Sequence, residues 1–322
     1  MDNLKDAYRQ EIEKTVGDIA QVPHDFSFAL LTDSHLDEGL SNTLCNIAAV
    51  DRQAHFDCAI HLGDFLTGNI TRSYTKKLLQ MQMQSFRDAV GTGVFYPVQG
   101  NHDGFLNNIG TSMQNIVLDE DWYEATAFVD AYPKVSRPGQ MPYFFVDYPD
   151  KKLRLIILCT QYYKEGVDRM KSYLRIGVDS AQLAWLSQSA LALESGWTVM
   201  VFSHDAPVTE AAREEGSPWG GTAVLDAFSE AMARGILVAG WFVGHHHGEY
   251  ITKINGIPIV LIGSQTSYVP QLWQPANGAG FYYDRKRNTL TEDLWDAVAL
   301  DMQARKVTLF RFGAGEDRSI FY

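Results

Sequence analysis

The sequence is poor in cysteine: its 322 residues include only three, at positions 45, 58 and 159. Three thiols cannot build the disulfide framework on which small secreted domains depend. Cys58 and Cys159 stand in apolar runs, which indicates small buried side chains rather than metal ligands. The sequence also lacks internal repeats and proline- or serine-rich linkers. We therefore expect one continuous domain over residues 1–322.

Positive charge is scarce too, since 27 Lys and Arg face 39 Asp and Glu and leave a net charge of −12. This balance argues against non-specific affinity for long nucleic acids or an anionic membrane. No apolar run reaches the ~18 residues that span a bilayer. The first residues lack the apolar core of a signal peptide. The expectation is a cytoplasmic protein with no membrane partner, and the oligomeric state stays open.

Apolar residues, 46% of the chain, fall into short runs that are typical of buried strands. These runs predict strands at residues 26–32, 58–62, 94–98, 153–159, 199–203 and 236–243. Helix-like stretches lie at about 1–22, 71–90, 180–194 and 223–234. Asp179 or Ser180 is a suitable N-cap for the third of them. Strands that alternate with helices favour an α/β layered fold with a largely buried sheet.

The pattern changes in the last part of the chain, about 248–322, which is rich in strands. Strands are predicted at 249–254, 257–262, 280–283, 295–300 and 306–312. Asn255-Gly256 between the first two is a strong hairpin signal. Residues 104–150 are irregular and rich in Asn, Asp, Pro and aromatics, so we expect an elaborated loop that takes part in substrate selection.

Five predicted strands end in side chains that commonly bind metals. The motifs are Asp33-Ser34-His35, Gly63-Asp64, Gly100-Asn101-His102-Asp103, Ser203-His204-Asp205 and Gly244-His245-His246-His247. In open α/β sheets, ligands bind beyond the carboxyl ends of the strands, so these groups are expected to converge. Each motif alone is typical of an ordinary turn or a surface histidine. The prediction rests on their common placement at the ends of strands.

Carboxylates, imidazoles and an amide oxygen, with no thiolate, suit Mn²⁺, Fe²⁺ or Zn²⁺. In an extended chain, alternate side chains point the same way, so Asp33 and His35 can share one cation. His245 and His247 have the same spacing. Asp64 can use both carboxylate oxygens to bridge two cations, which suits in-line phosphoryl transfer.

This ordered set of motifs resembles the calcineurin-like metallophosphoesterase superfamily, over about two thirds of the chain. The resemblance implies a four-layer α/β/β/α sandwich with a dinuclear metal centre. It implies that one divalent metal is held by Asp33, His35 and His247 and that Asp64 bridges to the other. The ligands implied for that second metal are Asn101, His204 and His245.

The expected mechanism is in-line attack on phosphorus by a metal-bridging hydroxide. His102 would protonate the departing oxygen, and Asp103 would orient the imidazole of His102. A competing interpretation makes His102 only a hydrogen-bond donor to a phosphate oxygen.

Departures from the motifs of particular subfamilies narrow the range of expected substrates. Asp64 is followed by Phe-Leu-Thr-Gly, unlike protein Ser/Thr phosphatases, and Thr67 stands where purple acid phosphatases have a tyrosinate ligand. What remains resembles the small bacterial phosphodiesterase and phosphomonoesterase branch, and the stretch 310–315 is similar to ones in such proteins from Gram-positive bacteria and their phages. Candidate substrate-binding residues are Asn107, Asn108, Tyr162, Tyr163, Tyr268 and Trp273.

The leading hypothesis is therefore hydrolysis of a small phosphate ester, with the choice of monoester or diester and the alcohol portion left open. A second hypothesis is a nuclease acting on nucleic-acid ends, which requires a basic groove. The third is a non-catalytic binding or structural protein on the same scaffold. All seven expected metal ligands are present, which argues against the third.

Overall fold

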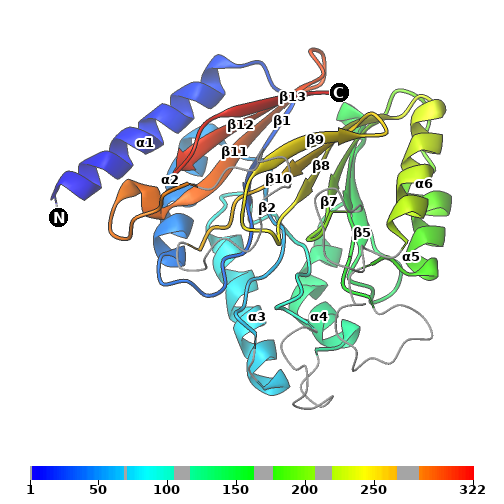
Figure 1. Cartoon of the computed structure of the whole chain (residues 1–322), viewed down its shortest axis with the longest axis horizontal. Helices are drawn as coiled ribbons and strands as arrows, with labels where there is room; N and C mark the ends of the chain where they lie inside the picture. Colours follow the sequence, from blue (N-terminus) through cyan, green and yellow to red (C-terminus); the bar gives the residue numbers. More distant parts are fainter. Residues whose placement is uncertain (1, 69–70, 105–116, 163–176, 207–219, 267–282) are drawn as a thin grey trace.

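Two β-sheets packed face to face form the centre of the fold (Figure 1). The computed structural model describes residues 2–68, 71–104, 117–162, 177–206, 220–266 and 283–322. Within them, the first sheet has the order β13-β12-β11-β1-β2-β3. Its strands are β1 (Phe26–Leu31), β2 (Cys58–His61), β3 (Phe95–Pro97), β11 (Leu294–Asp301), β12 (Lys306–Gly313) and β13 (Arg318–Phe321).

The second sheet has the order β4-β5-β6-β7-β8-β10-β9. Its strands are β4 (Val135–Ser136), β5 (Phe144–Tyr148), β6 (Leu153–Ile157), β7 (Thr198–Phe202), β8 (Leu237–Val243), β9 (Tyr250–Ile254) and β10 (Ile257–Leu261). The α-helices are α1 (Asp2–Gln21), α2 (Leu40–Ala54), α3 (Arg72–Asp88), α4 (Asp119–Thr126), α5 (Ser180–Trp185) and α6 (Gly221–Ala233). No described helix is both long and apolar enough to cross a membrane.

The side chains of β1 show how the layers are held together. Phe28 points between the sheets, where its ring lies 5.8 Å from that of Phe202 on β7. Leu31 points to the other face and packs with Val50 of α2 and Leu79 of α3. The outer face of the second sheet packs in the same way against α6. Because strand side chains alternate between faces, each sheet has one buried face towards its partner and one towards helices. The predicted α/β/β/α sandwich is confirmed.

The carboxyl ends of the central strands lie at one rim. In the first sheet β1, β2 and β3 are parallel, and in the second β6, β7, β8 and β10 are parallel. The strand-rich C-terminal part divides between the sheets, since β9 and β10 join the second sheet while β11, β12 and β13 extend the first. The rim therefore collects the turns that follow β1, β2, β3, β7 and β8.

Several local predictions are confirmed. The side chain of Asp179 caps α5 by accepting the backbone N–H of Gln182 at 2.7 Å. Asn255 and Gly256 have φ values of 49° and 83°, as the turn of a β9–β10 hairpin requires. Cys58 and Cys159 are buried.

Other predictions were wrong or incomplete. The expected loop over 104–150 contains α4, β4 and the buried strand β5, whose pairing with β6 depends on contacts outside the segment. The helix expected at 180–194 is α-helical only in α5 and continues as a π-helical turn, Leu186–Ala190. Helix α2 and strand β13 were not predicted. The strand expected at 280–283 lies almost wholly outside the described residues.

Asp293, just before β11, predicts a pH-dependent contribution to stability. Its carboxylate is buried and accepts hydrogen bonds from Thr43 at 2.6 Å and Asn46 at 2.8 Å, both on α2. Burial raises the pKa of Asp293 to about 6, from 3.8. The folded state thus holds this proton more tightly than the unfolded chain, and the contribution falls as the pH rises from about 4 to about 6.

Urea unfolding of the wild type and of Asp293→Asn between pH 4 and 7 measures this contribution. The wild type should lose up to about 1.4 kcal/mol per pH unit relative to the variant inside that window. Asp150→Asn, at an exposed position, is the matched control and should follow the wild type. Parallel curves for wild type and Asp293→Asn would contradict the prediction.

Candidate metal centre

The turns at the rim have an unusual backbone. Five expected ligands have positive φ angles: Asp33 (52°), His35 (45°), Asp64 (58°), His245 (69°) and His247 (58°). The left-handed region costs a residue with a side chain of order 1–3 kcal/mol. Such conformations persist only where the surrounding structure enforces them, and they cluster at functional sites. The local strain therefore supports the motifs as one site.

Two glycines allow these turns to approach each other. A Cβ on Gly100 would lie 2.2 Å from both the backbone nitrogen and the Oδ1 of Asp64. A Cβ on Gly244 would lie 2.0 Å from the hydroxyl of Thr32 and 2.7 Å from a carboxylate oxygen of Asp33. Both contacts are impossible for a larger residue, so these glycines set the spacing between the ligand-bearing turns.

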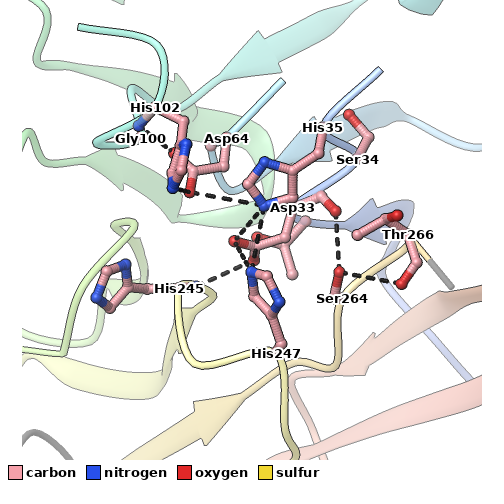
Figure 2. A network of polar contacts seen from close by, with 12 residues as sticks. Asp33, Ser34, His35, Asp64, Gly100, His102, His245, His247, Ser264 and Thr266 are labelled. Atoms are coloured by element: carbon pink, nitrogen blue, oxygen red, sulfur yellow. Dashed lines mark hydrogen bonds and ion pairs between the residues drawn. The ribbon is translucent and has the colours of Figure 1, made fainter. Parts of the chain in front are cut away.

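The first ligand group consists of Asp33, His35 and His247 (Figure 2). The Nε2 atoms of His35 and His247 lie 3.2 Å apart. Oδ1 of Asp33 lies 3.2 Å from Nε2 of His247 and 3.8 Å from Nε2 of His35. Three potential ligand atoms from the ends of β1 and β8 thus face one point.

The hydrogen bonds around the first ligand group leave its potential ligand atoms available to a cation. Oδ2 of Asp33 accepts the hydroxyl of Thr32 at 2.6 Å and the backbone N–H of His245 at 3.0 Å. Oδ1 of Asp33 is buried and has no hydrogen-bond partner among the described residues. Nδ1 of His35 lies 3.0 Å from the carbonyl oxygen of Leu66. A neutral ring that donates there presents the Nε2 lone pair to the site.

The second ligand group consists of Asn101, His204 and His245. Oδ1 of Asn101 lies 2.9 Å from Nε2 of His204 and 2.7 Å from Nδ1 of His245. Nδ1 of His204 lies 2.8 Å from the carbonyl oxygen of Leu62, which directs its Nε2 lone pair inward in the same way.

Asp64 lies between the two groups. Its Oδ2 is 3.9 Å from Nε2 of His35 in the first ligand group and 3.3 Å from Nε2 of His204 in the second. Its Oδ1 accepts the backbone N–H of His102 at 2.7 Å. The donor set of oxygens and imidazole nitrogens fits divalent cations, and Asp64 is placed to serve both groups.

The charges of the site indicate that a cation would take the place of a proton on an imidazole. Burial alone would raise the pKa of Asp33, but His247 and the other imidazoles hold it well below its ordinary value. Burial would lower the pKa of His204, but the carboxylate of Asp64 raises it well above its ordinary value. A proton on His204 would thus balance these carboxylates, and because a ligating imidazole must release its proton, cations and protons compete for this site.

His102 lies at the edge of the centre, with its Nε2 3.9 Å from Oδ2 of Asp64. Its Nδ1 lies 2.9 Å from the carbonyl oxygen of Thr67. Asp103, expected to orient the imidazole of His102, accepts the backbone N–H groups of Asp64 (2.9 Å), Leu66 (3.1 Å) and Gly100 (3.0 Å). Its carboxylate therefore joins the turns after β2 and β3, and the carbonyl of Thr67 lies against Nδ1 of the His102 ring.

The candidate substrate residues are mostly not described. Asn107, Asn108, Tyr163, Tyr268 and Trp273 lie outside the described residues. Tyr162 follows the end of β6 and is partly buried, and burial raises the pKa of its hydroxyl.

Sequence reasoning did not single out Asp205, which lies beside His245. Its carboxylate lies 3.5 Å from Nε2 of His245. Asp205 follows His204 at the end of a predicted strand, so the signal was present. The partner, forty positions away, was not evident because it depends on β7 and β8 being neighbours.

The chain is similar to known proteins in sequence and in fold. A model of the calcineurin-like phosphoesterase family matches residues 26–249. The chain is similar to a dimetal phosphatase from Danio rerio, with 15% identity over 93% of this chain and 100% of that chain and a TM-score of 0.58. It also resembles phosphopantetheinyl hydrolase from Mycobacterium tuberculosis, with 12% identity over 76% of this chain and 91% of that chain and a TM-score of 0.42.

No curated protein matches the sequence. At 15% identity the likeness to the Danio rerio structure shows the fold. The matched range covers more than half of the chain and contains every expected metal ligand. This chain therefore belongs to the calcineurin-like phosphoesterase family.

Proposed function

We propose that the chain is a dinuclear metal-dependent phosphoesterase that hydrolyses small phosphate monoesters or diesters. The observation that carries the proposal is the position of Asp64, whose Oδ2 lies 3.9 Å from His35 of the first ligand group and 3.3 Å from His204 of the second. A carboxylate shared by two sets of ligand atoms is the arrangement expected of a two-metal site.

Each ligand group would hold one divalent cation of the Mn²⁺, Fe²⁺ or Zn²⁺ type. Asp33, His35 and His247 would bind one, and Asn101, His204 and His245 the other. Such a pair of cations supplies a water of lowered pKa for in-line attack and neutralises the phosphoryl oxygens. The carboxylates of Asp33 and Asp64 offset the positive charge of the cations and fix the spacing of the two groups.

His102 is the proposed acid for the leaving group. Its side chain is 28% exposed, so a substrate can reach it. An imidazolium ring that donates Nδ1–H to the carbonyl of Thr67 would have its Nε2–H free to transfer to the departing oxygen. Asp103 would support the reaction by holding the turn that carries His102 and Asn101, through the three amide contacts described above.

The net charge of −12 favours a small substrate over a long nucleic acid, because polyphosphate chains need a basic footprint. The two cations would make the centre a local positive site on an acidic protein. Tyr162 remains a proposed substrate contact, together with Asn107, Tyr268 and Trp273.

Removal of the shared carboxylate tests this function. Metal-free protein is loaded with Mn²⁺, and hydrolysis of an aryl phosphodiester, an aryl phosphomonoester and a short single-stranded oligonucleotide is measured alongside metal content. The wild type should bind two Mn²⁺ and hydrolyse at least one of the small esters. Asp64→Asn should retain fewer than two ions and lose hydrolysis, because it lacks the oxygen common to both groups.

Asp150→Asn provides the matched control at an exposed position and should behave as the wild type. Two bound ions without hydrolysis of any substrate would favour a binding protein. Cleavage of the oligonucleotide alone would favour a nuclease. Failure of the wild type to bind two ions would contradict the proposed dinuclear centre.

A further inference from the structure

The imidazole of His245 lies between two oxygen acceptors. Its Nδ1 is 2.7 Å from the amide oxygen of Asn101, on the side of the second ligand group. Its Nε2 is 3.5 Å from Oδ1 of Asp205. A neutral imidazole has one N–H and one lone pair, so only one of these nitrogens can donate. The nitrogen that donates determines which one is available to a cation.

Asp205 is held in place from the end of the neighbouring strand β6. Asp205 is buried, with 2% of its surface exposed. Oδ2 accepts hydrogen bonds from the hydroxyl of Thr160 at 2.9 Å and from the side-chain amide of Gln161 at 2.5 Å. These two contacts fix the plane of the carboxylate and leave Oδ1 directed at the ring of His245.

Oδ1 of Asp205 has no hydrogen-bond partner among the described residues. A buried carboxylate oxygen without a donor is unfavourable. The Nε2–H of His245 can satisfy it, since a movement of ~0.5 Å brings the pair within ordinary hydrogen-bond distance. The opposite tautomer would set the Nε2 lone pair of His245 against the carboxylate.

We propose that Asp205 is a positioning residue: it accepts the Nε2–H of His245 and thereby directs the Nδ1 lone pair towards Asn101 and a bound cation. This inference rests on the proposed function. Thr160 and Gln161 act through Asp205, because they keep its carboxylate aligned. A carboxylate partner also makes a ligating imidazole more basic, which strengthens its bond to a metal.

His204 shows the contrast within the same ligand group. Its outer nitrogen, Nδ1, lies against the backbone carbonyl of Leu62 at 2.8 Å. A side-chain substitution cannot remove that carbonyl. Of the two imidazoles in the second ligand group, His245 is therefore the one whose orientation depends on a side chain that can be replaced.

Zinc binding to the metal-free full chain tests the role of Asp205. In calorimetric titration, Asp205→Ala should bind one Zn²⁺ with wild-type affinity and the other about 10–100-fold more weakly. Asp205→Asn should recover part of the loss because its amide oxygen can still accept the hydrogen bond. Asp226→Asn, at an exposed position on α6, is the matched control and should bind both ions normally.

Nitrogen NMR of the imidazole rings provides a readout that a purely structural role would not change. Zinc-loaded wild type should show His245 protonated at Nε2 and metal-bound at Nδ1, and Asp205→Ala should lose this pattern. Circular dichroism establishes that each variant is folded. If the alanine variant is unfolded, the asparagine variant is used for the test, with a smaller expected loss of affinity for the second Zn²⁺.

The outcomes separate this inference from the proposed function. Wild-type affinity for both ions in the Asp205 variants, with an unchanged His245 signal, would overturn the role of Asp205 alone. A wild type that binds fewer than two ions, or that hydrolyses neither small ester, would contradict the proposed function and with it the basis of this inference.

Discussion

Replacement of His102 by alanine should leave the metal content unchanged and lower turnover by about 10²–10⁴-fold. Nε2 of His102 lies 3.9 Å from Oδ2 of Asp64, at the edge of the ligand groups. The two expected ligand sets do not include it. The loss should be greatest for esters with poor leaving groups, because these depend most on protonation of the departing oxygen.

Steady-state kinetics with a series of aryl esters of increasing leaving-group pKa would measure this effect. His24→Ala is the matched control, since His24 is exposed and contacts the backbone oxygen of Val22. It should keep wild-type turnover throughout the series. A uniform loss across the series would indicate that His102 only donates a hydrogen bond to phosphate. Unchanged turnover would exclude both roles.

Replacement of Arg311 by methionine should lower the free energy of unfolding by about 3–5 kcal/mol. Arg311 on β12 is 2% exposed. Its guanidinium forms ion pairs with Glu249 and with Asp296, the latter at 3.2 Å. Arg318 contacts the same two carboxylates. Loss of one guanidinium leaves two buried carboxylates with a single cationic partner.

The charge state of Glu249 supports this expectation. Burial would raise the pKa of Glu249, but Arg311 and Arg318 hold it below its ordinary value. The carboxylate is thus ionised in the folded protein at neutral pH. Its burial costs free energy that the ion pairs offset, and removal of Arg311 takes away part of this compensation. The cluster also joins the start of β9 to β11, β12 and β13, which lie in the other sheet.

Urea unfolding with a matched surface variant would measure the loss. Arg9→Met breaks the exposed pair of Arg9 and Asp6, and it should cost less than about 1 kcal/mol. The double variant Glu249→Gln, Arg311→Met should be less destabilised than Arg311→Met, because Asp296 and Arg318 then remain as a balanced pair. A loss in Arg311→Met no larger than in Arg9→Met would contradict the prediction.

Much of the site was predictable because its ligands follow strands with simple patterns. The apolar run before Asp33 forms β1, and the run before Asp64 forms β2. A parallel strand fixes the position of the residues that follow it, so motifs at the ends of several such strands meet at one rim. The observed distances among His35, Asp64 and His204 agree with this expectation.

Other elements were not predictable from local patterns. Strand β5 lies in a segment rich in turn-forming residues, and pairing with β6 stabilises it. The hydrogen bonds of the Asp103 carboxylate were not predictable either, because they depend on where the turns after β2 and β3 lie in the folded protein. This carboxylate accepts the backbone N–H groups of Asp64 and Leu66.

Residue types and short-range periodicity were enough to identify the family, the order of the expected ligands and the strands that precede them. Which atoms meet depends on the folded arrangement: Asp64 lies between the two ligand groups, Asp205 lies beside His245, and buried charges join the two sheets. These contacts connect residues far apart in the chain. Their distances and directions follow from the packing of the sheets, which no local pattern specifies.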